Sequence, residues 1–398
     1  MSETILVVNA GSSSIKFQLF SLDTRNQVNR LLKGQVEGIG VHPRLVANGT
    51  DGEPPIEEAW PEPEVASVPQ ALDKLVAFLR ARLGRLPTAI GHRVVHGGPD
   101  YSEPTIIDDA VLERLEAFSP LAPLHQPNNL ALIRAVRARQ PQLLQVACFD
   151  TAFHRGHPEV ADRYALPEQL YAEGVRRYGF HGLSYEYIAN RLPEIAPNIA
   201  RGRVVVAHLG SGASMCAISA GKSVESTLGF TALDGLPMGT RPGQLDPGIV
   251  LYLMEEKRMS AKEIEHFLYN ECGLKGLSGI SNDVRELLAS RDPRAKLALD
   301  HFVYRISLYA GMLAAAMGGI DGFVFTAGIG ENAPSIREAV AERLAWLGLD
   351  FDRESNANGR TLISRARSRI ACYVIPTDEE LMIARHTLAV LRAKRKAA

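Results

Sequence analysis

The stretch Ile5-Leu-Val-Val-Asn-Ala-Gly-Ser-Ser-Ser-Ile-Lys-Phe-Gln-Leu-Phe20 decides how the rest of the chain is interpreted. Its first apolar run, residues 5–8, predicts a buried strand, and the alternation from residue 15 to residue 19 predicts a second strand. Gly11 and three serines lie between them, and Lys16 follows. A turn of this kind offers backbone N–H groups, hydroxyls and a positive charge, which together suit a phosphate. An ordinary serine-rich hairpin explains the stretch equally well.

The composition limits the class of protein. A length of 398 residues predicts two or three domains, and a hydrophobic fraction of 46% predicts a large core in a soluble globular protein. The net charge of -1 gives no electrostatic reason to expect nucleic acid or a membrane as a partner. The N-terminal residues lack the pattern of a signal peptide, so none is expected. The apolar run 302–317 is too short to span a bilayer and is expected to be a core helix.

The four cysteines, Cys148, Cys216, Cys272 and Cys372, are far apart and form no C-x-x-C pair. This usage favours reduced, mostly buried thiols in a cytoplasmic protein.

Strand and helix patterns alternate along the chain, which predicts an α/β fold. Helices are expected at residues 69–83, 110–118, 128–139, 185–192, 247–256 and 261–270. Strands are expected at residues 89–95, 143–149, 204–209, 322–326 and 370–376. Ser184 is expected to cap the helix that follows it, and Pro334 to open another.

An internal echo indicates duplication. Val7-Val-Asn-Ala-Gly-Ser-Ser and Val206-Ala-His-Leu-Gly-Ser-Gly share one layout at an offset of 199 residues, about half the chain. Each reads as a strand, a polar residue and a small loop. We expect a two-fold duplicated α/β domain that brings such loops to opposite sides of a cleft.

Three glycine-containing turns follow strands, at Gly11, at residues 210–212 and at residues 328–330. Three such turns in one chain, one beside Lys16 and one opening a helix at Pro334, favour a nucleotide. The chain contains neither the G-x-x-x-x-G-K-[ST] motif nor the signatures of protein kinases.

Several polar residues lie where ligands bind in α/β proteins. His92 and His96 have H-x-x-x-H spacing, but the Gly-Gly that follows favours a structural or substrate-facing role over a metal helix. Further histidines end strands or loops, namely His125, His181 and His208.

Two arginines and two carboxylates complete this set. Arg93 and Arg241 lie at glycine-containing turns, where a guanidinium can grip phosphate or carboxylate. Asp150 and Glu379 directly follow apolar strands, which suits Mg²⁺ ligands or catalytic groups. Helix N-capping by the Asp150 and Thr377–Glu380 segments is the structural alternative.

The ordered motifs resemble those of the acetate kinase family, within the superfamily of sugar kinases, heat-shock ATPases and actins. The motifs are Asn9-Ala-Gly-Ser-Ser-Ser-Ile-Lys16, Gly91-His-Arg-Val-Val-His-Gly-Gly98, Leu121-Ala-Pro-Leu-His125, Phe149-Asp-Thr-Ala-Phe-His154, Tyr178-Gly-Phe-His-Gly-Leu-Ser184, Met238-Gly-Thr-Arg241, Ser281-Asn-Asp-Val-Arg285 and Thr326-Ala-Gly-Ile-Gly-Glu-Asn332. They cover nearly the whole chain, so the resemblance is specific.

The resemblance implies an α/β fold of two duplicated actin-like ATPase domains with ribonuclease-H-like cores and an active-site cleft between them. Residues 1–149, completed by the helix 380–398, would form the N-terminal domain, and residues 150–379 the C-terminal nucleotide-binding domain. The implied reaction is reversible transfer of phosphate from ATP to acetate, giving ADP and acetyl phosphate. Mg²⁺ is the implied metal, with Mn²⁺ as a substitute. The implied partners are these small molecules and a second copy in a homodimer, with neither nucleic acid nor membrane.

The resemblance also assigns residues. Asn9 and Glu379 would hold the metal, and Arg93, Asp150, His181 and Arg241 would be catalytic. ATP would contact Ser12, Ser14, Lys16, His208, Leu209, Gly210, Ser211, Gly212, Asp283, Val284, Arg285, Gly328, Ile329, Gly330, Glu331 and Asn332. The acid would contact Arg93, Val95, Leu124, His125, Phe180 and Ala232. Because a carboxylate substrate is already ionised at neutral pH, we expect Asp150 to orient other groups and not to act as a general base.

Four positions depart from the family pattern. Ser211 and Asp378 replace asparagines, Leu183 replaces a threonine, and Ala232 replaces a proline. Ser211 affects the expected phosphate contact, and Ala232 affects the expected acyl specificity. A kinase for propionate or butyrate therefore stays open. A nucleotide-driven binding or assembly protein of the same fold is the alternative from another class.

Overall fold

The computed structural model describes residues 3–11, 14–23, 27–49, 54–123 and 125–397. The chain forms two compact units: unit 1 comprises Met1–Ala152 and Asp378–Ala398, and unit 2 comprises Phe153–Thr377. The boundaries expected from the sequence fell after residues 149 and 379. In the structure, Asp150 and Glu379 belong to unit 1, which also contains Arg93.

Unit 1 is built on a mixed sheet. In the part of the chain that the structure describes, this sheet has eight strands in the order β5-β4-β3-β2-β1-β6-β8-β7. Strand β1 pairs antiparallel with β2 and parallel with β6, which in turn pairs parallel with β8. The strands are β1 Thr4–Ala10, β2 Ser14–Leu22, β3 Val28–Glu37, β4 Arg44–Gly49, β5 Ile56–Ala59, β6 Ala89–Val94, β7 Thr105–Ile106 and β8 Leu144–Phe149.

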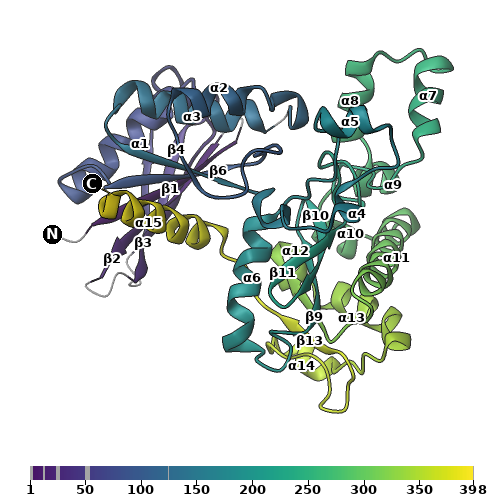
Figure 1. The fold of residues 1–398 in the computed structure, drawn as a ribbon. Coiled ribbons are helices and arrows are strands. Elements are labelled where there is room, and N and C mark those ends of the chain that lie inside the picture. Colours follow the sequence, from purple (N-terminus) through teal and green to yellow (C-terminus); the bar gives the residue numbers. More distant parts are fainter. Residues whose placement is uncertain (1–2, 12–13, 24–26, 50–53, 124, 398) are drawn as a thin grey trace. The chain divides into compact units, whose positions relative to one another are not determined.

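Helices cover both faces of this sheet (Figure 1). The helices are α1 Val68–Leu83, α2 Asp109–Glu116, α3 Gln126–Arg139 and α15 Glu379–Ala397, with short 3-10 turns η1 Glu62–Glu64, η2 Ser119–Leu121 and η3 Ala152–His154. Apolar residues of α1 and α3 share one core with Leu6, Val8 and Phe17. Helix α15 packs on the side of Gly91, where an added Cβ would lie 2.4 Å from Thr387 Oγ1. Glycine on β6 is therefore what lets α15 approach the sheet.

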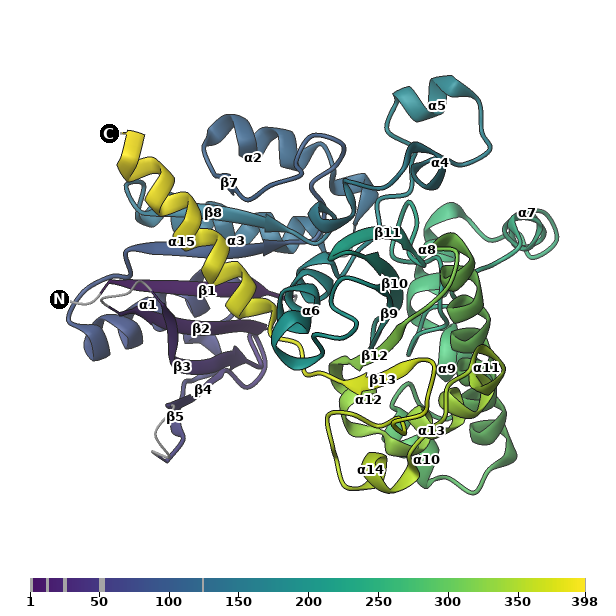
Figure 2. The ribbon, with the colours of Figure 1, turned by 60° about the horizontal axis from the view of Figure 1, so that its bottom comes forward.

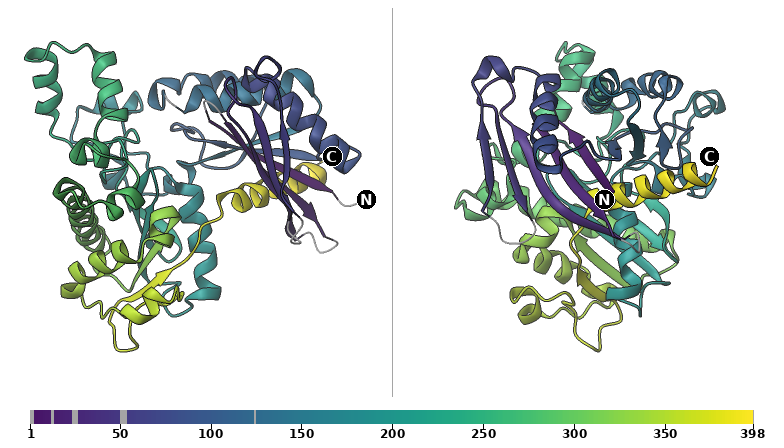
Figure 3. Two further views of the ribbon diagram at one scale, coloured as in Figure 1. Left: turned by 180° about the vertical axis from the view of Figure 1, so that it is seen from behind. Right: turned by 90° about the vertical axis from the view of Figure 1, so that its left-hand side faces the viewer.

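The two ends of the described chain meet in unit 1. Arg395 Nη1, near the end of α15, donates to Glu3 Oε2 at 3.0 Å, and both ends can be followed in Figure 3. The C-terminal segment is thus part of the N-terminal fold.

Unit 2, in which every residue is described, contains a five-stranded sheet in the order β11-β10-β9-β12-β13. Its strands are β9 Arg203–Leu209, β10 Ala213–Ser219, β11 Lys222–Ser226, β12 Gly322–Thr326 and β13 Ala371–Val374. Its helices are α4 Glu159–Asp162, α5 Glu168–Ala172, α6 Gly182–Ile195, α7 Pro247–Glu255, α8 Ala261–Asn270, α9 Gly273–Ser278, α10 Val284–Ala289, α11 Pro293–Ala316, α12 Ala327–Asn332, α13 Pro334–Arg343 and α14 Arg353–Ala357, with η4 Ala345–Leu347. Helices α6 and α11 lie on opposite faces of this sheet (Figure 2).

The predicted duplication is confirmed by the strand order. The order β3-β2-β1-β6-β8 within unit 1 matches β11-β10-β9-β12-β13 of unit 2, with the same directions from the third strand to the fifth. The hairpins at the centre of each core differ in their connection. Ala10 pairs with Ile15 in unit 1, whereas Leu209 pairs with Ala213 in unit 2, so the loop of unit 1 is one residue longer.

Two local predictions were wrong. Ser184 does not cap α6, because that helix begins at Gly182 and His181 occupies the N-cap position with a left-handed backbone (φ 57°). Residues 328–332 form helix α12 and not an open loop. The helix is stabilised because the backbone N–H of Ala327 donates to Glu331 Oε1 at 2.9 Å, a bond invisible in a glycine-rich sequence.

Two further expectations concern the apolar run 302–317 and the four cysteines. The apolar run 302–317 lies within α11, and among the described residues no helix has the length and apolar character needed to cross a membrane. None of the four cysteines, all of them described, forms a disulfide, and all except Cys272 are buried.

Candidate functional site

In unit 1 the residues expected to act on the acid and metal meet at the carboxyl end of the sheet. Arg93 lies near the end of β6, and Asp150 follows β8, the parallel neighbour of β6. Arg93 Nε donates to Asp150 Oδ1 at 3.1 Å, and Arg93 Nη2 donates to Asp150 Oδ2 at 2.5 Å. The first residue of α15 joins them, with Glu379 Oε2 3.6 Å from Arg93 Nε.

Asp150 is buried and Arg93 and Glu379 are partly buried, so the charges of the three side chains affect one another. Burial by itself lowers the pKa of Arg93, but the charges of Asp150 and Glu379 outweigh it and raise that pKa. Burial raises the pKa of Asp150 against the opposing effect of Arg93. Burial also raises the pKa of Glu379 to about 7; Arg93 opposes this shift, and Asp150, Glu380 and Asp378 add to it. Two carboxylates, those of Asp150 and Glu379, therefore face the single guanidinium of Arg93.

Other predicted residues of unit 1 lie at loop ends. Asn9 is half-buried and pairs across the hairpin with the exposed Lys16. Ser14, the first residue of β2, is half-buried, whereas the predicted residues Ser12 and Leu124 lie outside the described residues. Val95 is buried beyond the end of β6, and His125 precedes α3 at its N-cap position.

In unit 2 two histidines stack. The rings of His181 and His208 are 4.2 Å apart with an angle of 15° between their planes. His181 Nδ1 is 2.7 Å from Ser214 Oγ, which also forms a hydrogen bond with the Tyr185 hydroxyl. His208 Nδ1 is 2.8 Å from Ser184 Oγ. Serines on β10 and α6 therefore hold both rings in place.

The loop after β9 lies beside these groups. A Cβ added to Gly212 would be 3.4 Å from His181 Nε2 and 3.8 Å from Arg241 Nη2. Glycine at this position leaves open the space that both side chains border. Arg241 Nη1 donates to the Ala232 carbonyl at 3.0 Å, and burial lowers the pKa of Arg241. Phe180, the neighbour of His181, is buried.

A pocket of about 430 Å³ opens next to the same loop. It is lined by Gly210, Ser211, Asn282, Asp283, Val284, Arg285, Gly328, Ile329, Asn332 and Ala333. Asp283 caps α10, since its Oδ1 accepts from the backbone N–H of Arg285 at 2.8 Å. Eight of the sixteen residues predicted to contact the nucleotide line this pocket. Gly330 and Glu331 are among those that do not: Glu331 Oε1 accepts backbone N–H groups of Ala327 and Thr377 and thus supports α12.

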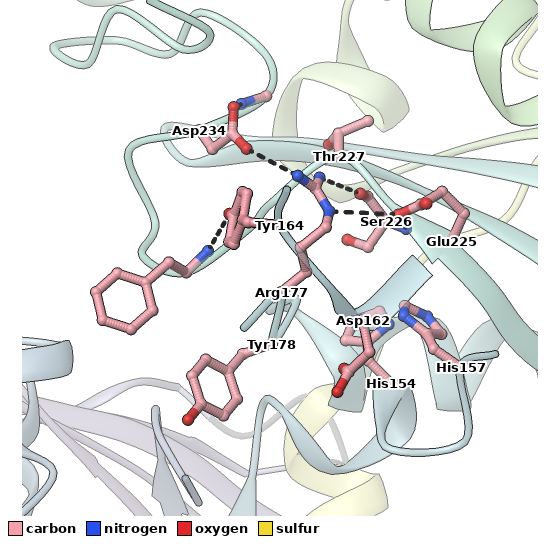
Figure 4. Close-up of polar contacts among 12 residues, drawn as sticks. His154, His157, Asp162, Tyr164, Arg177, Tyr178, Glu225, Ser226, Thr227 and Asp234 are labelled. Atoms are coloured by element: carbon pink, nitrogen blue, oxygen red, sulfur yellow. Dashed lines mark hydrogen bonds and ion pairs between the residues drawn. The ribbon is translucent and has the colours of Figure 1, made fainter. Parts of the chain in front are cut away.

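A network of polar contacts holds the segment 226–235, to which Ala232 belongs (Figure 4). Arg177 Nη2 donates to the Ser226 carbonyl at 3.3 Å, and Nη1 donates to Asp234 Oδ2 at 3.5 Å. The hydroxyl of Tyr164 accepts from the backbone N–H of Phe230 at 2.8 Å. The segment 226–235 is thus fastened at several points to the chain before α6.

Sequence reasoning missed several residues of this region. Asn282 and Ala333 line the pocket and adjoin the motifs at 283–285 and 328–332, so adjacency could have indicated them. Ser214 and Tyr185 gave no signal, because their contact with His181 depends on the register of β10. Among the described residues, no group of three or more His, Cys, Asp and Glu side chains has the arrangement of a metal site.

Comparison with known proteins gives consistent matches over nearly the whole chain. The model of the acetokinase family matches residues 4–385. An acetate kinase of Nitrobacter hamburgensis is 64% identical over 98% of this chain and 96% of its own, and one of Rhizobium meliloti is 56% identical over 98% and 99%. A solved propionate kinase of Francisella tularensis superposes with a TM-score of 0.90 at 38% identity, covering 97% of this chain and 99% of its own. The acetate kinase of Porphyromonas gingivalis has a TM-score of 0.86 at 38% identity, covering 98% and 100%.

Proposed function

We propose that this chain, which belongs to the acetokinase family, transfers the γ-phosphoryl group of ATP to acetate and catalyses the reverse reaction from acetyl phosphate and ADP. The observation that carries the proposal is that His181 Nε2 and Arg241 Nη2 lie 3.4 Å and 3.8 Å from the place that a Cβ of Gly212 would take, in the loop after β9. Two potential donors then border one open space beside a glycine-rich loop, as a transferring phosphoryl group requires.

The chemistry explains why positive groups matter more than a base. Acetate is ionised at neutral pH, so its oxygen is already the nucleophile. The main difficulty is the repulsion between this anion and the negative γ-phosphate. Arg93 would bind the carboxylate, and His181 and Arg241 would stabilise charge on the phosphoryl group in the transition state. Asp150 would orient Arg93, because its two carboxylate oxygens accept hydrogen bonds from Nε and Nη2 of the guanidinium.

The nucleotide is proposed to occupy the pocket of unit 2. Its base and ribose would lie between residues 282–285 and helix α12, and its phosphates would contact the loop 208–212. Lys16, Ser12 and Ser14 would add phosphate contacts from the hairpin of unit 1. The acyl group would pack against Val95, Leu124, His125, Phe180 and Ala232.

The carboxylates of unit 1 support the proposal of a divalent cation. Asp150 is 1% exposed, and Glu379 lies in an enclosed position among other acids, with Arg93 beside both. Oxygen ligands of this kind suit Mg²⁺, which is typically held by one or two carboxylates together with substrate phosphates. Asn9 and Glu379 would hold Mg²⁺ or Mn²⁺, and the bound ion would neutralise phosphate charge. Chelation should abolish turnover, and either ion should restore it; full activity in excess chelator would contradict the assignment.

A homodimer is the proposed assembly, and neither nucleic acid nor a membrane is a proposed partner. Helix α11 exposes large apolar side chains at Leu297, Tyr304, Leu308 and Met312. Their successive spacings of seven, four and four residues place the side chains on one helical face, which suits burial by a second copy. Leu308→Asp should shift the mass measured by light scattering from dimer to monomer. A monomeric wild type would overturn this point. Four cysteines without a disulfide support a cytoplasmic location.

The experiment that tests the proposal is a hydroxylamine trap for acyl phosphate. Purified protein with ATP, Mg²⁺ and acetate should give the acetyl hydroxamate. A nucleotide-driven assembly protein of the same fold would hydrolyse or bind ATP without forming it. Propionate is the second candidate substrate, since a propionate kinase superposes closely and Ala232 is smaller than the usual proline. Comparing kcat/KM for acetate, propionate and butyrate decides between them.

A further inference from the structure

His154 is buried at the end of η3, outside the groups assigned so far, and both of its ring nitrogens are engaged. Its side chain is 0% exposed. Nε2 lies 3.0 Å from the carbonyl oxygen of Phe180, the residue before His181. Nδ1 lies 2.8 Å from Ser223 Oγ on β11. His154 thus connects the sheet of unit 2 with the loop that carries His181; the ring is labelled in Figure 4.

The positions of the hydrogens on His154 and His157 follow from which neighbouring groups can donate a hydrogen bond. A carbonyl oxygen only accepts, so Nε2 of His154 carries the hydrogen. Burial, followed by the neighbouring His157, lowers the pKa of His154 well below its ordinary value, so the ring is neutral. Its Nδ1 then accepts the hydroxyl proton of Ser223. His157 Nε2, 2.6 Å from the same oxygen, must therefore be a donor to Ser223.

The loop that His154 contacts has an unfavourable backbone. His181 has φ of 57°, a left-handed conformation that is unfavourable for a residue with a side chain. Gly179 has φ of 71°, and a Cβ there would lie 2.6 Å from the His154 ring. Such a backbone persists only where its surroundings hold it.

The neighbouring residue holds the preceding carbonyl groups. Arg155 Nη2 donates to the carbonyls of Arg177 at 2.9 Å and Tyr178 at 3.2 Å. The same nitrogen is 3.0 Å from Asp162 Oδ1, so the guanidinium is itself anchored. Residues 154 and 155 together hold three carbonyl oxygens within the four residues before His181.

We propose that His154 is a positioning residue for His181: its neutral ring, oriented by Ser223, donates to the Phe180 carbonyl and fixes the backbone from which His181 reaches the phosphoryl group. The inference rests on the proposed role of His181. His154 touches no reacting atom in this scheme. Its contribution is to the geometry of the transition state, where a displacement of about 1 Å can cost on the order of 10²-fold in rate.

Two amide substitutions separate positioning from simple burial. The amide nitrogen of Gln reaches about as far as Nε2, whereas that of Asn reaches about as far as Nδ1. His154→Gln keeps a donor for the Phe180 carbonyl, and His154→Asn does not. We expect kcat to fall about 10-fold or more in His154→Asn and to stay within about threefold in His154→Gln, with KM for ATP within about twofold in both. Equal losses of kcat in the two variants would overturn the proposal.

His157→Asn is the matched control, because it removes a hydrogen bond to the same Ser223 hydroxyl without touching the loop. It should lower the melting temperature while leaving kcat within about twofold. If it lowers kcat as much as His154→Asn, the loss is a general effect of packing and the proposal is wrong. If His154→Asn does not fold, Ser223→Ala takes its place, because it retains His154 and removes the hydrogen bond that Nδ1 of the ring accepts. It should lower kcat by about threefold, and unchanged kcat there would count against the proposal.

A double-mutant cycle distinguishes failure of this inference from failure of the proposed function. His181→Asn should lower kcat strongly, and adding His154→Asn should then cost less than about twofold, because residues that act through one another are not additive. Independent, additive losses would reject positioning through His181. If His181→Asn alone retains full kcat, the proposed role of His181 fails, whatever the His154 variants show.

Discussion

The two units have the same core but carry different chemistry at equivalent positions. Asn9 is the next-to-last residue of β1, and His208 is the next-to-last residue of β9. The end of the unit 1 sheet gathers carboxylates around one arginine, whereas unit 2 gathers imidazoles and Arg241 around a glycine loop. Duplication thus supplies two equivalent strand-and-loop frameworks, and the side chains decide what each binds.

The connections between the cores are reciprocal. Helix α6 is the long helix that follows β8 of unit 1, yet its apolar side chains share a core with the strands of unit 2. Helix α15 follows β13 of unit 2, yet it packs on β1 and β6. Each core is therefore completed by a helix that follows the last strand of the other.

The largest expected effects compare the two arginines. Arg241→Ala should lower kcat by roughly 10²-fold or more, because it removes a transition-state donor, with little change in stability. Arg93→Ala should raise KM for acetate and lower kcat/KM by a similar factor. It should also lower the melting temperature, because it leaves the buried carboxylate of Asp150 without its partner. Steady-state kinetics and thermal unfolding of both variants test this.

The comparison fails if the two variants are alike. Near-normal turnover in Arg241→Ala would remove Arg241 from the chemistry. An unchanged melting temperature in Arg93→Ala would mean that the Arg93–Asp150 pair contributes nothing to stability.

The next effect concerns the stability of the protein in acid, because each unit holds a histidine whose pKa is lowered by burial. Burial lowers the pKa of His92 to about 4 in unit 1, and burial likewise lowers that of His157 to about 4 in unit 2. Each of these histidines binds its proton less readily in the folded protein than in the unfolded chain. Its contribution to stability is therefore fully present above pH 6.5 and is lost as the pH falls towards 4. For His92 the pKa differs by about 2.5 between the unfolded and folded states, which corresponds to a loss of stability on the order of 3 kcal/mol.

His92→Gln retains an amide for Gln145, which His92 Nε2 meets at 2.8 Å, and removes the titrating group. Unfolding by urea between pH 7 and pH 4 should therefore show a flatter loss of stability in the variant than in the wild type. Parallel curves would show that His92 does not contribute to acid sensitivity.

Much of the fold was predictable because it depends on local patterns. The run at 322–326 gave β12 with its observed bounds, and the echo between residues 7 and 206 gave the repeated hairpin. The two wrong predictions share a cause. Glu331 stabilises α12, and α6 begins behind a left-handed histidine, so in both cases side-chain or backbone geometry outweighs the preference of the local sequence.

The residues of the candidate site were predictable only where a motif carried them. Arg93 and Asp150 stand in separate motifs, and the parallel pairing of β6 with β8 explains why they meet. Ser214 and Ser223 lie in stretches without any distinctive pattern, and their contacts with His181 and His154 depend on strand register and folding of the chain over tens of residues. Residues that support a site from behind are therefore those that sequence reasoning misses.

A smaller effect concerns the role of Asp150. If this carboxylate orients Arg93 and removes no proton, Asp150→Asn should lower kcat about tenfold and keep the acid limb of the pH–rate profile, because the limb belongs to another group. The measurement is kcat against pH with saturating Mg²⁺ in both proteins. Disappearance of the limb in the variant would instead make Asp150 a general base and give unit 1 a part in proton transfer.

The smallest expected effect concerns Ala232, whose carbonyl receives a hydrogen bond from Arg241. The family resemblance implies that proline is usual here, and alanine has a smaller side chain, so the acyl pocket should accept one further methylene more readily. A methylene in an apolar pocket is worth about 1–3 kcal/mol, and a factor of ten corresponds to about 1.4 kcal/mol. We therefore expect kcat/KM for acetate and propionate to differ by less than about tenfold in the wild type. Ala232→Pro should widen that ratio severalfold while leaving kcat with acetate within about twofold, since the carbonyl that holds Arg241 is retained. An unchanged ratio would show that position 232 does not shape the pocket. A large fall in kcat with acetate would show that its backbone serves Arg241 and not acyl selection.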